Sequence, residues 1–163
     1  MPTMPSTSAL SHLTAQSRFT SPGFLLASVG KVAEAWITEA MAPLDLLPRE
    51  AAALLVLRTY GAMTQQQLGE LLDLDANYLV MVLKKLESRD LVARTRDPRD
   101  RRRHVVEITA TGSAVRDQVD TAVEQVEIRL LRRLDEDEVD TLRSLLFLVD
   151  DVTGRKRRLA EGP

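Results

Sequence analysis

Basic residues are concentrated in one short segment of this 163-residue chain. From Lys84 to Arg103 there are nine basic and four acidic residues, although the whole chain has a net charge of -2. Crowded arginines repel one another unless an anion is present, and the phosphates of a nucleic acid supply such anions. The segment therefore predicts a surface that binds a nucleic-acid backbone, and the alternative is an ordinary solvated turn.

The composition argues against several other kinds of chemistry. Cysteine is absent, which excludes disulfides, thiolate catalysis and cysteine-ligated zinc. The two histidines, His12 and His104, are too few and too far apart in the sequence to suggest a metal site. No glycine-rich phosphate loop or nucleophile motif is present, so we predict no enzyme activity and no cofactor. No apolar run is long enough for a membrane span, so we expect no membrane partner. No address signal is evident, so we expect a cytoplasmic protein.

Apolar residues recur at intervals of three and four along most of the chain, which is typical of amphipathic helices. A first helix is expected over residues 21–41, where Pro43 ends it, and a second begins at Pro48. Two long helices are expected near the carboxyl end, the last of them capped by Asp135 and Glu138. The first and the last two helices carry more apolar surface than one chain can cover, so we expect a homodimer.

Two short helices before the basic segment are expected to form a helix-turn-helix. Thr64 and Gln67 have the spacing of a capping box at the start of the first helix, which ends near Leu72, and Asp75 can cap the second. The second helix has a buried stripe of leucine and valine and an opposite, outward face. That outward face carries Asn77, Met81, Lys84 and Ser88.

A β-hairpin is predicted directly after the helix-turn-helix. Residues 91–94 and 105–109 alternate or are β-branched, and the arginine-rich turn lies between them. The predicted fold is therefore mainly α: a winged helix-turn-helix with a helical dimerisation region and a two-stranded β wing. The expected divisions are a disordered tail (1–20), a single domain (21–157) with dimerisation helices at 21–42 and 111–157 around a winged helix-turn-helix at 46–110, and a C-terminal tail (158–163).

With these motifs, the chain resembles the MarR (multiple antibiotic resistance regulator) family of bacterial transcription factors over about residues 24–152. The likeness is most specific in the hairpin, where the family has a leucine-valine-x-arginine strand, an aspartate-proline-x-aspartate-arginine-arginine turn and a valine-x-leucine-threonine strand before a glycine. The matching segments here are Leu91-Val92-Ala93-Arg94, Asp97-Pro98-Arg99-Asp100-Arg101-Arg102 and Val106-Glu107-Ile108-Thr109 with Gly112. The resemblance implies a homodimer that represses transcription at an inverted-repeat operator in double-stranded DNA.

The sequence departs from the family at three places. Asp90 stands where the family usually has glycine, although aspartate also tolerates a left-handed backbone. Leu47 replaces a threonine that often caps the following helix. The recognition helix carries Asn77, Tyr78 and Met81 where many members have serine, threonine and arginine. We expect these last changes to affect sequence preference rather than DNA binding itself.

The resemblance also implies roles for individual residues. Arg102 would enter the minor groove and Asp100 would orient it. In the major groove, Asn77 and Tyr78 are candidates for base edges and Met81 for a thymine methyl group. Lys84, Lys85, Arg94 and Arg96 are expected to neutralise phosphates, and Thr64, Arg99, Arg101 and Arg103 complete the predicted DNA-binding set.

Two aromatic residues are candidates for an effector site. The family binds aromatic or phenolic small molecules. Trp36 and Tyr60 could line a pocket for such a molecule between the dimerisation helices and the winged helix-turn-helix. The alternative for both residues is packing in the core. Two other functions stay open at this point: a winged-helix protein-interaction module without DNA binding, and an enzyme.

Overall fold

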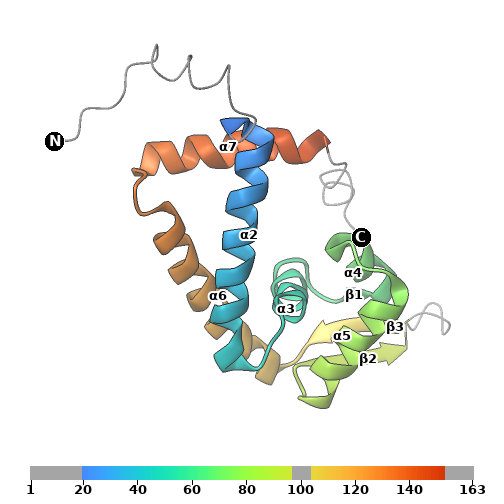
Figure 1. Ribbon diagram of the computed structural model, residues 1–163. Helices are drawn as coiled ribbons and strands as arrows, with labels where there is room; N and C mark the ends of the chain where they lie inside the picture. Colours follow the sequence, from blue (N-terminus) through green and yellow to red (C-terminus); the bar gives the residue numbers. More distant parts are fainter. Residues whose placement is uncertain (1–19, 97–103, 153–163) are drawn as a thin grey trace, which may run out of the picture. The chain divides into compact units, whose positions relative to one another are not determined.

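The computed structural model describes residues 20–96 and 104–152, and its contacts divide the chain into two compact units, up to Trp36 and from Ile37 onward. The elements in chain order are α2 (Pro22–Met41), the 3-10 turn η2 (Ala42–Leu44), α3 (Pro48–Tyr60), β1 (Met63–Thr64), α4 (Gln65–Leu72), α5 (Ala76–Ser88), β2 (Val92–Arg96), β3 (His104–Ile108), α6 (Ala110–Leu131) and α7 (Glu136–Val152) (Figure 1). This order confirms the predicted fold class. Most of the predicted tails and the whole arginine-rich turn lie outside the described residues, and the domain boundaries stay a prediction.

Side chains that the sequence already marks define several helix ends. At the start of α4, the Thr64 hydroxyl accepts a hydrogen bond from the Gln67 N–H (3.2 Å), and the Gln67 amide oxygen accepts one from the Thr64 N–H (2.9 Å). At the start of α5, Asp75 accepts from the N–H groups of Asn77 and Tyr78 at 3.0 and 2.9 Å. The predicted capping box of α7 is also present. These caps satisfy N–H groups that would otherwise lack partners.

The predicted two-stranded wing is part of a three-stranded antiparallel sheet. Strands β2 and β3 pair along their whole lengths, and β1 adds to the other edge of β3 through Met63 and Thr64, which gives the order β1-β3-β2. The sequence prediction missed β1 because two residues are too few to show an alternating pattern. This strand is defined by pairing with residues far later in the chain, and it ties the start of α4 to the wing.

Helix α3 lies at the centre of the core in the unit from Ile37 onward. Figure 1 shows it between α6 and the pair formed by α4 and α5. Leucines of α3, α4 and α5 meet in one buried cluster. Helix α3 contributes Leu54 and Leu57, α4 contributes Leu68, and α5 contributes Leu79, Leu83 and Leu86. Burial of this apolar surface fixes α4 and α5 against α3.

The wing and α6 meet at a tight joint directly after α5. Asp90 has a φ of +55°, so the aspartate adopts the left-handed conformation expected there, and its carbonyl accepts from the Thr109 hydroxyl at 2.6 Å. The Thr109 hydroxyl also accepts from the Gly112 N–H at 2.9 Å and so caps α6. A Cβ atom at Gly112 would lie 1.9 Å from the Leu91 carbonyl oxygen. Only glycine fits at this contact, which explains the threonine-x-x-glycine pattern.

Replacing Gly112 with alanine tests this joint. We expect Gly112→Ala to lower the free energy of unfolding by roughly 1–3 kcal/mol, because the new methyl group overlaps backbone rather than a flexible side chain. Denaturant unfolding of the purified chain measures the change. Gly23→Ala is the matched control, since nothing lies within 4 Å of a Cβ atom at Gly23. Equal stability of Gly112→Ala and wild type would contradict the close contact.

Candidate nucleic-acid interface

Helix α5 has one buried side and one exposed side, as predicted. Leu79, Val82, Leu83 and Leu86 are buried. Asn77 and Lys84 are exposed on the other side, and Met81 between them is 65% exposed. A methionine this exposed on a well-packed helix does not serve the core of its own chain. The outward face of α5 therefore combines an amide, an apolar side chain and a cation in positions open to a partner.

Two predicted DNA-contact residues make interactions within their own chain. Tyr78 is half-buried and packs against the core. The Thr64 hydroxyl, besides accepting from the Gln67 N–H, donates to the Gln67 amide oxygen at 2.8 Å. Both hydrogen-bonding functions of that hydroxyl are used in the cap of α4. DNA contacts by these two residues stay predictions.

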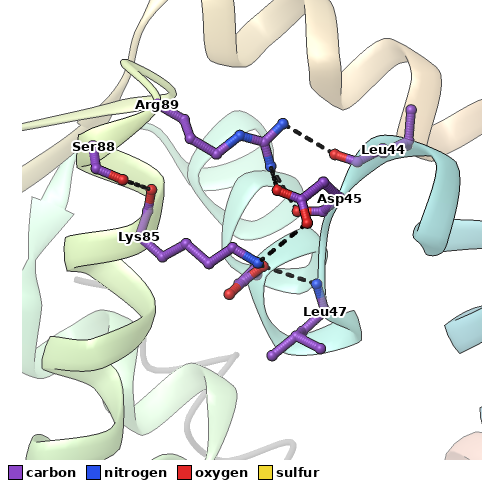
Figure 2. A network of polar contacts seen from close by, with 7 residues as sticks. Leu44, Asp45, Leu47, Lys85, Ser88 and Arg89 are labelled. Atoms are coloured by element: carbon purple, nitrogen blue, oxygen red, sulfur yellow. Dashed lines mark hydrogen bonds and ion pairs between the residues drawn. The ribbon is translucent and has the colours of Figure 1, made fainter.

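Lys85 is directed toward carboxylates of its own chain rather than outward. Its Nζ lies 3.2 Å from Oε2 of Glu50 and 3.9 Å from Oδ1 of Asp45. Glu50 is only 2% exposed. Among the residues that the structure describes, it is the one charged side chain buried in the core. Figure 2 shows Lys85 reaching from α5 to the loop that precedes α3. Its surroundings differ from those of the exposed Lys84, so the two lysines are unequal candidates for phosphate binding.

The two arginines of β2 also differ. Arg94 is half-buried, and its Nε and Nη2 both donate to Oε2 of Glu87 on α5, the Nε at 3.0 Å. This hydrogen bond from Arg94 holds the pKa of Glu87 below its ordinary value. Arg96 is exposed at the end of β2. Arg94 therefore joins the wing to the recognition helix, whereas Arg96 is open to an anion.

The predicted tip of the wing lies outside the described residues. Its candidate residues are Arg99, Asp100, Arg101, Arg102 and Arg103. The structure places Arg96 opposite His104 in the pairing of β2 and β3, so the connecting segment begins and ends at paired strand ends. The roles predicted for the tip residues, including minor-groove entry by Arg102, stay predictions.

The two candidate effector residues fall in different compact units. Trp36 is half-buried in α2, and Tyr60, the last residue of α3, is 44% exposed. Neither is a fully buried core residue. A pocket that both residues line stays a prediction.

Other kinds of site are not evident in residues 20–96 and 104–152. Across these ranges, no group of three acidic or histidine side chains is placed to hold a metal ion, and no helix is long and apolar enough to cross a membrane. One buried side-chain nitrogen described there, Nε of Arg116, has no hydrogen-bond partner, while the Nη atoms of the same residue pair with Asp117 and Asp120 at 2.9 and 2.7 Å.

Sequence reasoning missed a polar network that ties the end of α5 to the loop before α3. Arg89 donates from Nη1 to the Asp45 carbonyl at 2.7 Å and from Nη2 to the Leu44 carbonyl at 3.0 Å (Figure 2). Oε2 of Glu50 accepts from the Leu47 N–H at 2.8 Å. One signal was available: Leu47 and Glu50 have capping-box spacing, and the glutamate half of the box works without a hydroxyl at the first position.

Comparison with known proteins finds the same arrangement elsewhere. Residues 46–104 match the family model of the MarR family. The multiple antibiotic resistance protein MarR of Escherichia coli is 30% identical over 125 residues, which are 76% of this chain and 87% of that protein.

Two solved structures are similar to this one. A mutant MarR from E. coli complexed with operator DNA has a TM-score of 0.72 and 28% identity, covering 82% of this chain and 99% of that chain. CouR from Rhodococcus jostii RHA1 bound to p-coumaroyl-CoA has a TM-score of 0.71 and 28% identity, covering 80% and 92%. Since sequence and fold agree over most of both lengths, the chain belongs to the MarR family of winged helix-turn-helix transcriptional regulators.

Proposed function

We propose that this chain is a sequence-specific DNA-binding transcriptional regulator that acts as a homodimer on an inverted-repeat operator. The observation that carries the proposal is the outward face of α5, where Asn77, Met81 and Lys84 are exposed opposite a buried stripe. A helix divided in this way can enter a major groove while it stays packed on its own domain. The MarR relative complexed with operator DNA supports the same conclusion. We also propose that the chain has no catalytic activity and needs no cofactor.

The exposed residues of α5 and β2 divide into two kinds of contact. Near the amino end of α5, Asn77 pairs with an adenine edge and Met81 contacts a thymine methyl group, which reads sequence. Lys84 and Arg96 neutralise phosphates, which positions the protein without reading sequence. At the wing tip, Arg102 enters the minor groove and Asp100 orients it.

Two variants on the same helix face separate these roles. The DNA probes are a duplex selected by the wild-type chain from a random library and a duplex of scrambled sequence. Asn77→Ala should weaken binding to the selected duplex by roughly 1–3 kcal/mol and leave the scrambled duplex unaffected. Lys84→Ala should weaken binding to both equally and reduce the slope of log affinity against log salt by about one.

Fluorescence anisotropy at several salt concentrations measures both effects. Thermal unfolding controls for the fold of each variant. If wild-type affinity for both duplexes persists in both variants, α5 is not the DNA-binding helix.

The exposed apolar surface of helix α7 supports the proposed dimer. Five consecutive apolar residues on it are between 41% and 66% exposed, namely Leu145, Leu146, Phe147, Leu148 and Val149. Consecutive helical residues point about 100° apart, so this part of α7 is apolar on all sides. Helix α2 also exposes large apolar side chains, among them Phe24, Leu25 and Val29. A second copy of the chain covers such surfaces in a symmetric assembly.

A charge placed on α7 tests dimerisation. Leu145→Glu should reduce the solution mass to that of one chain, or unfold the protein, because the interface would bury an unpaired carboxylate. Thr141→Glu, at an exposed polar position of the same helix, should keep the dimer mass. Light scattering at micromolar concentration gives the masses. A wild-type mass of one chain would refute the proposed homodimer.

We also propose that the regulator is a cytoplasmic repressor released by an aromatic or phenolic effector. Bound to an operator, a dimer blocks a promoter by occupying it. The CouR relative was solved bound to p-coumaroyl-CoA, which carries a phenol. Trp36 and Tyr60 are the proposed aromatic contacts for the effector. A small change in the spacing of two recognition helices would disturb both half-sites together.

Such release requires reciprocal coupling between the two ligands. An effector that weakens DNA binding tenfold must itself bind tenfold less tightly to the DNA-bound dimer, a difference of about 1.4 kcal/mol. Calorimetric titration of phenols and aromatic carboxylates into the free and DNA-bound protein measures this difference. Equal affinity in the two states would show that the compound is no effector.

A further inference from the structure

We propose that Asp45, Glu50, Lys85 and Arg89 form a clamp that sets the orientation of the recognition helix on DNA. The residues of this clamp are positioning residues. From their charge alone, Lys85 and Arg89 would be expected to bind phosphates, but both contact groups of their own chain. The proposal rests on the proposed DNA-binding function and deepens it, because it identifies what holds the reading face of α5 in place.

The first half of the clamp is an ion pair with a buried carboxylate. Oε2 of Glu50 accepts from the Leu47 N–H at 2.8 Å and lies 3.2 Å from Nζ of Lys85. Glu50 is 2% exposed, so its charge has lost most of its contact with water. A buried carboxylate needs a nearby cation, and Lys85 supplies it from α5. Moving Lys85 to a phosphate would leave that carboxylate uncompensated.

The second half of the clamp is a guanidinium fork on backbone oxygens. Arg89 donates to the carbonyls of Leu44 and Asp45 at 3.0 and 2.7 Å, and its Nη1 lies 3.8 Å from Oδ2 of Asp45 (Figure 2). The loop turns sharply here, since Asp45 has a φ of +50°. The planar fork of arginine can satisfy two acceptors at once, which a lysine cannot do with the same geometry.

The two halves act on the same side of α5. Lys85 and Arg89 are four residues apart, so they lie one above the other on that helix. Both reach the segment from η2 to the first turn of α3, which the core holds through buried Leu46 and Ala51. Rotation of α5 about its axis, or a tilt away from α3, breaks both contacts together.

Small changes in the angle of α5 displace the residues at its amino end, which carry the proposed contacts to bases. Asn77 lies about 18 Å along the helix axis from Arg89, so a tilt of about 5° at Arg89 moves Asn77 by about 1.5 Å. Hydrogen bonds to base edges tolerate a few tenths of an ångström. The clamp therefore controls specific binding, whereas contacts to phosphates away from the amino end tolerate the change.

The test compares clamp variants with an outward-facing neighbour. Arg89→Lys keeps the charge and removes the fork, and Lys85→Met keeps the stem and removes the charge. Lys84→Met is the matched control on the exposed side of α5. Because Lys85→Met leaves Glu50 unpaired and can destabilise the fold, the double variant Glu50→Gln with Lys85→Met is measured beside it. The glutamine oxygen can still accept from the Leu47 N–H.

The clamp predicts a distinct signature in the selected-duplex and scrambled-duplex assay. Arg89→Lys and the double variant should lose affinity for the selected duplex by on the order of tenfold, with scrambled-duplex affinity and salt slope unchanged. Lys84→Met should weaken both duplexes in parallel and reduce the salt slope by about one. Dimer mass and circular dichroism should match wild type throughout.

Two results would overturn the clamp alone. One is a reduced salt slope with parallel weakening of both duplexes in Arg89→Lys and the double variant, which would make Arg89 and Lys85 phosphate contacts. The other is unchanged affinity for both duplexes. If the wild-type chain selects no duplex at all, the proposed DNA-binding function fails and the clamp's role fails with it.

Discussion

Helix α5 must bury one side while it presents the other, and the rest of the unit from Ile37 onward is arranged around this requirement. Its leucine and valine stripe packs against α3 and α4, which leaves Asn77, Met81 and Lys84 exposed. The end of the helix is then fixed by the left-handed Asp90 and by the close approach of Gly112 to the Leu91 carbonyl. Apolar packing gives the helix its stability, and the joint sets where the wing and α6 begin.

The distribution of charge around α5 separates cations used within the chain from cations open to a ligand. Lys85 and Arg94 pair with Glu50 and Glu87, respectively. Lys84, next to Lys85, and Arg96, two residues after Arg94, are exposed. Ion pairs at the surface contribute little stability, but a pair that includes a carboxylate as buried as that of Glu50 constrains geometry strongly. Net charge along the sequence therefore overstates how much of the cationic surface DNA can use.

The sequence predicted the features that depend on neighbouring residues. The capping box of Thr64, the cap at Asp75 and the two sides of α5 follow from spacing within one or two helical turns. The sequence could not predict strand β1 or the partner of Lys85, because both depend on residues brought together only by the fold. Helical spacing places Lys84 on the outward face, but only the fold shows that the adjacent Lys85 pairs with a buried carboxylate of α3.

Hydroxyl-radical footprinting of the wild-type dimer on the selected duplex would show whether two copies of α5 read two half-sites of one operator. Two recognition helices in a dimer meet successive major grooves roughly 34 Å apart. We expect two protected regions of the same sequence, related by a two-fold axis and separated by about one helical turn. A single protected region, or protection without an inverted repeat, would mean that the two copies of α5 do not read two half-sites of one operator.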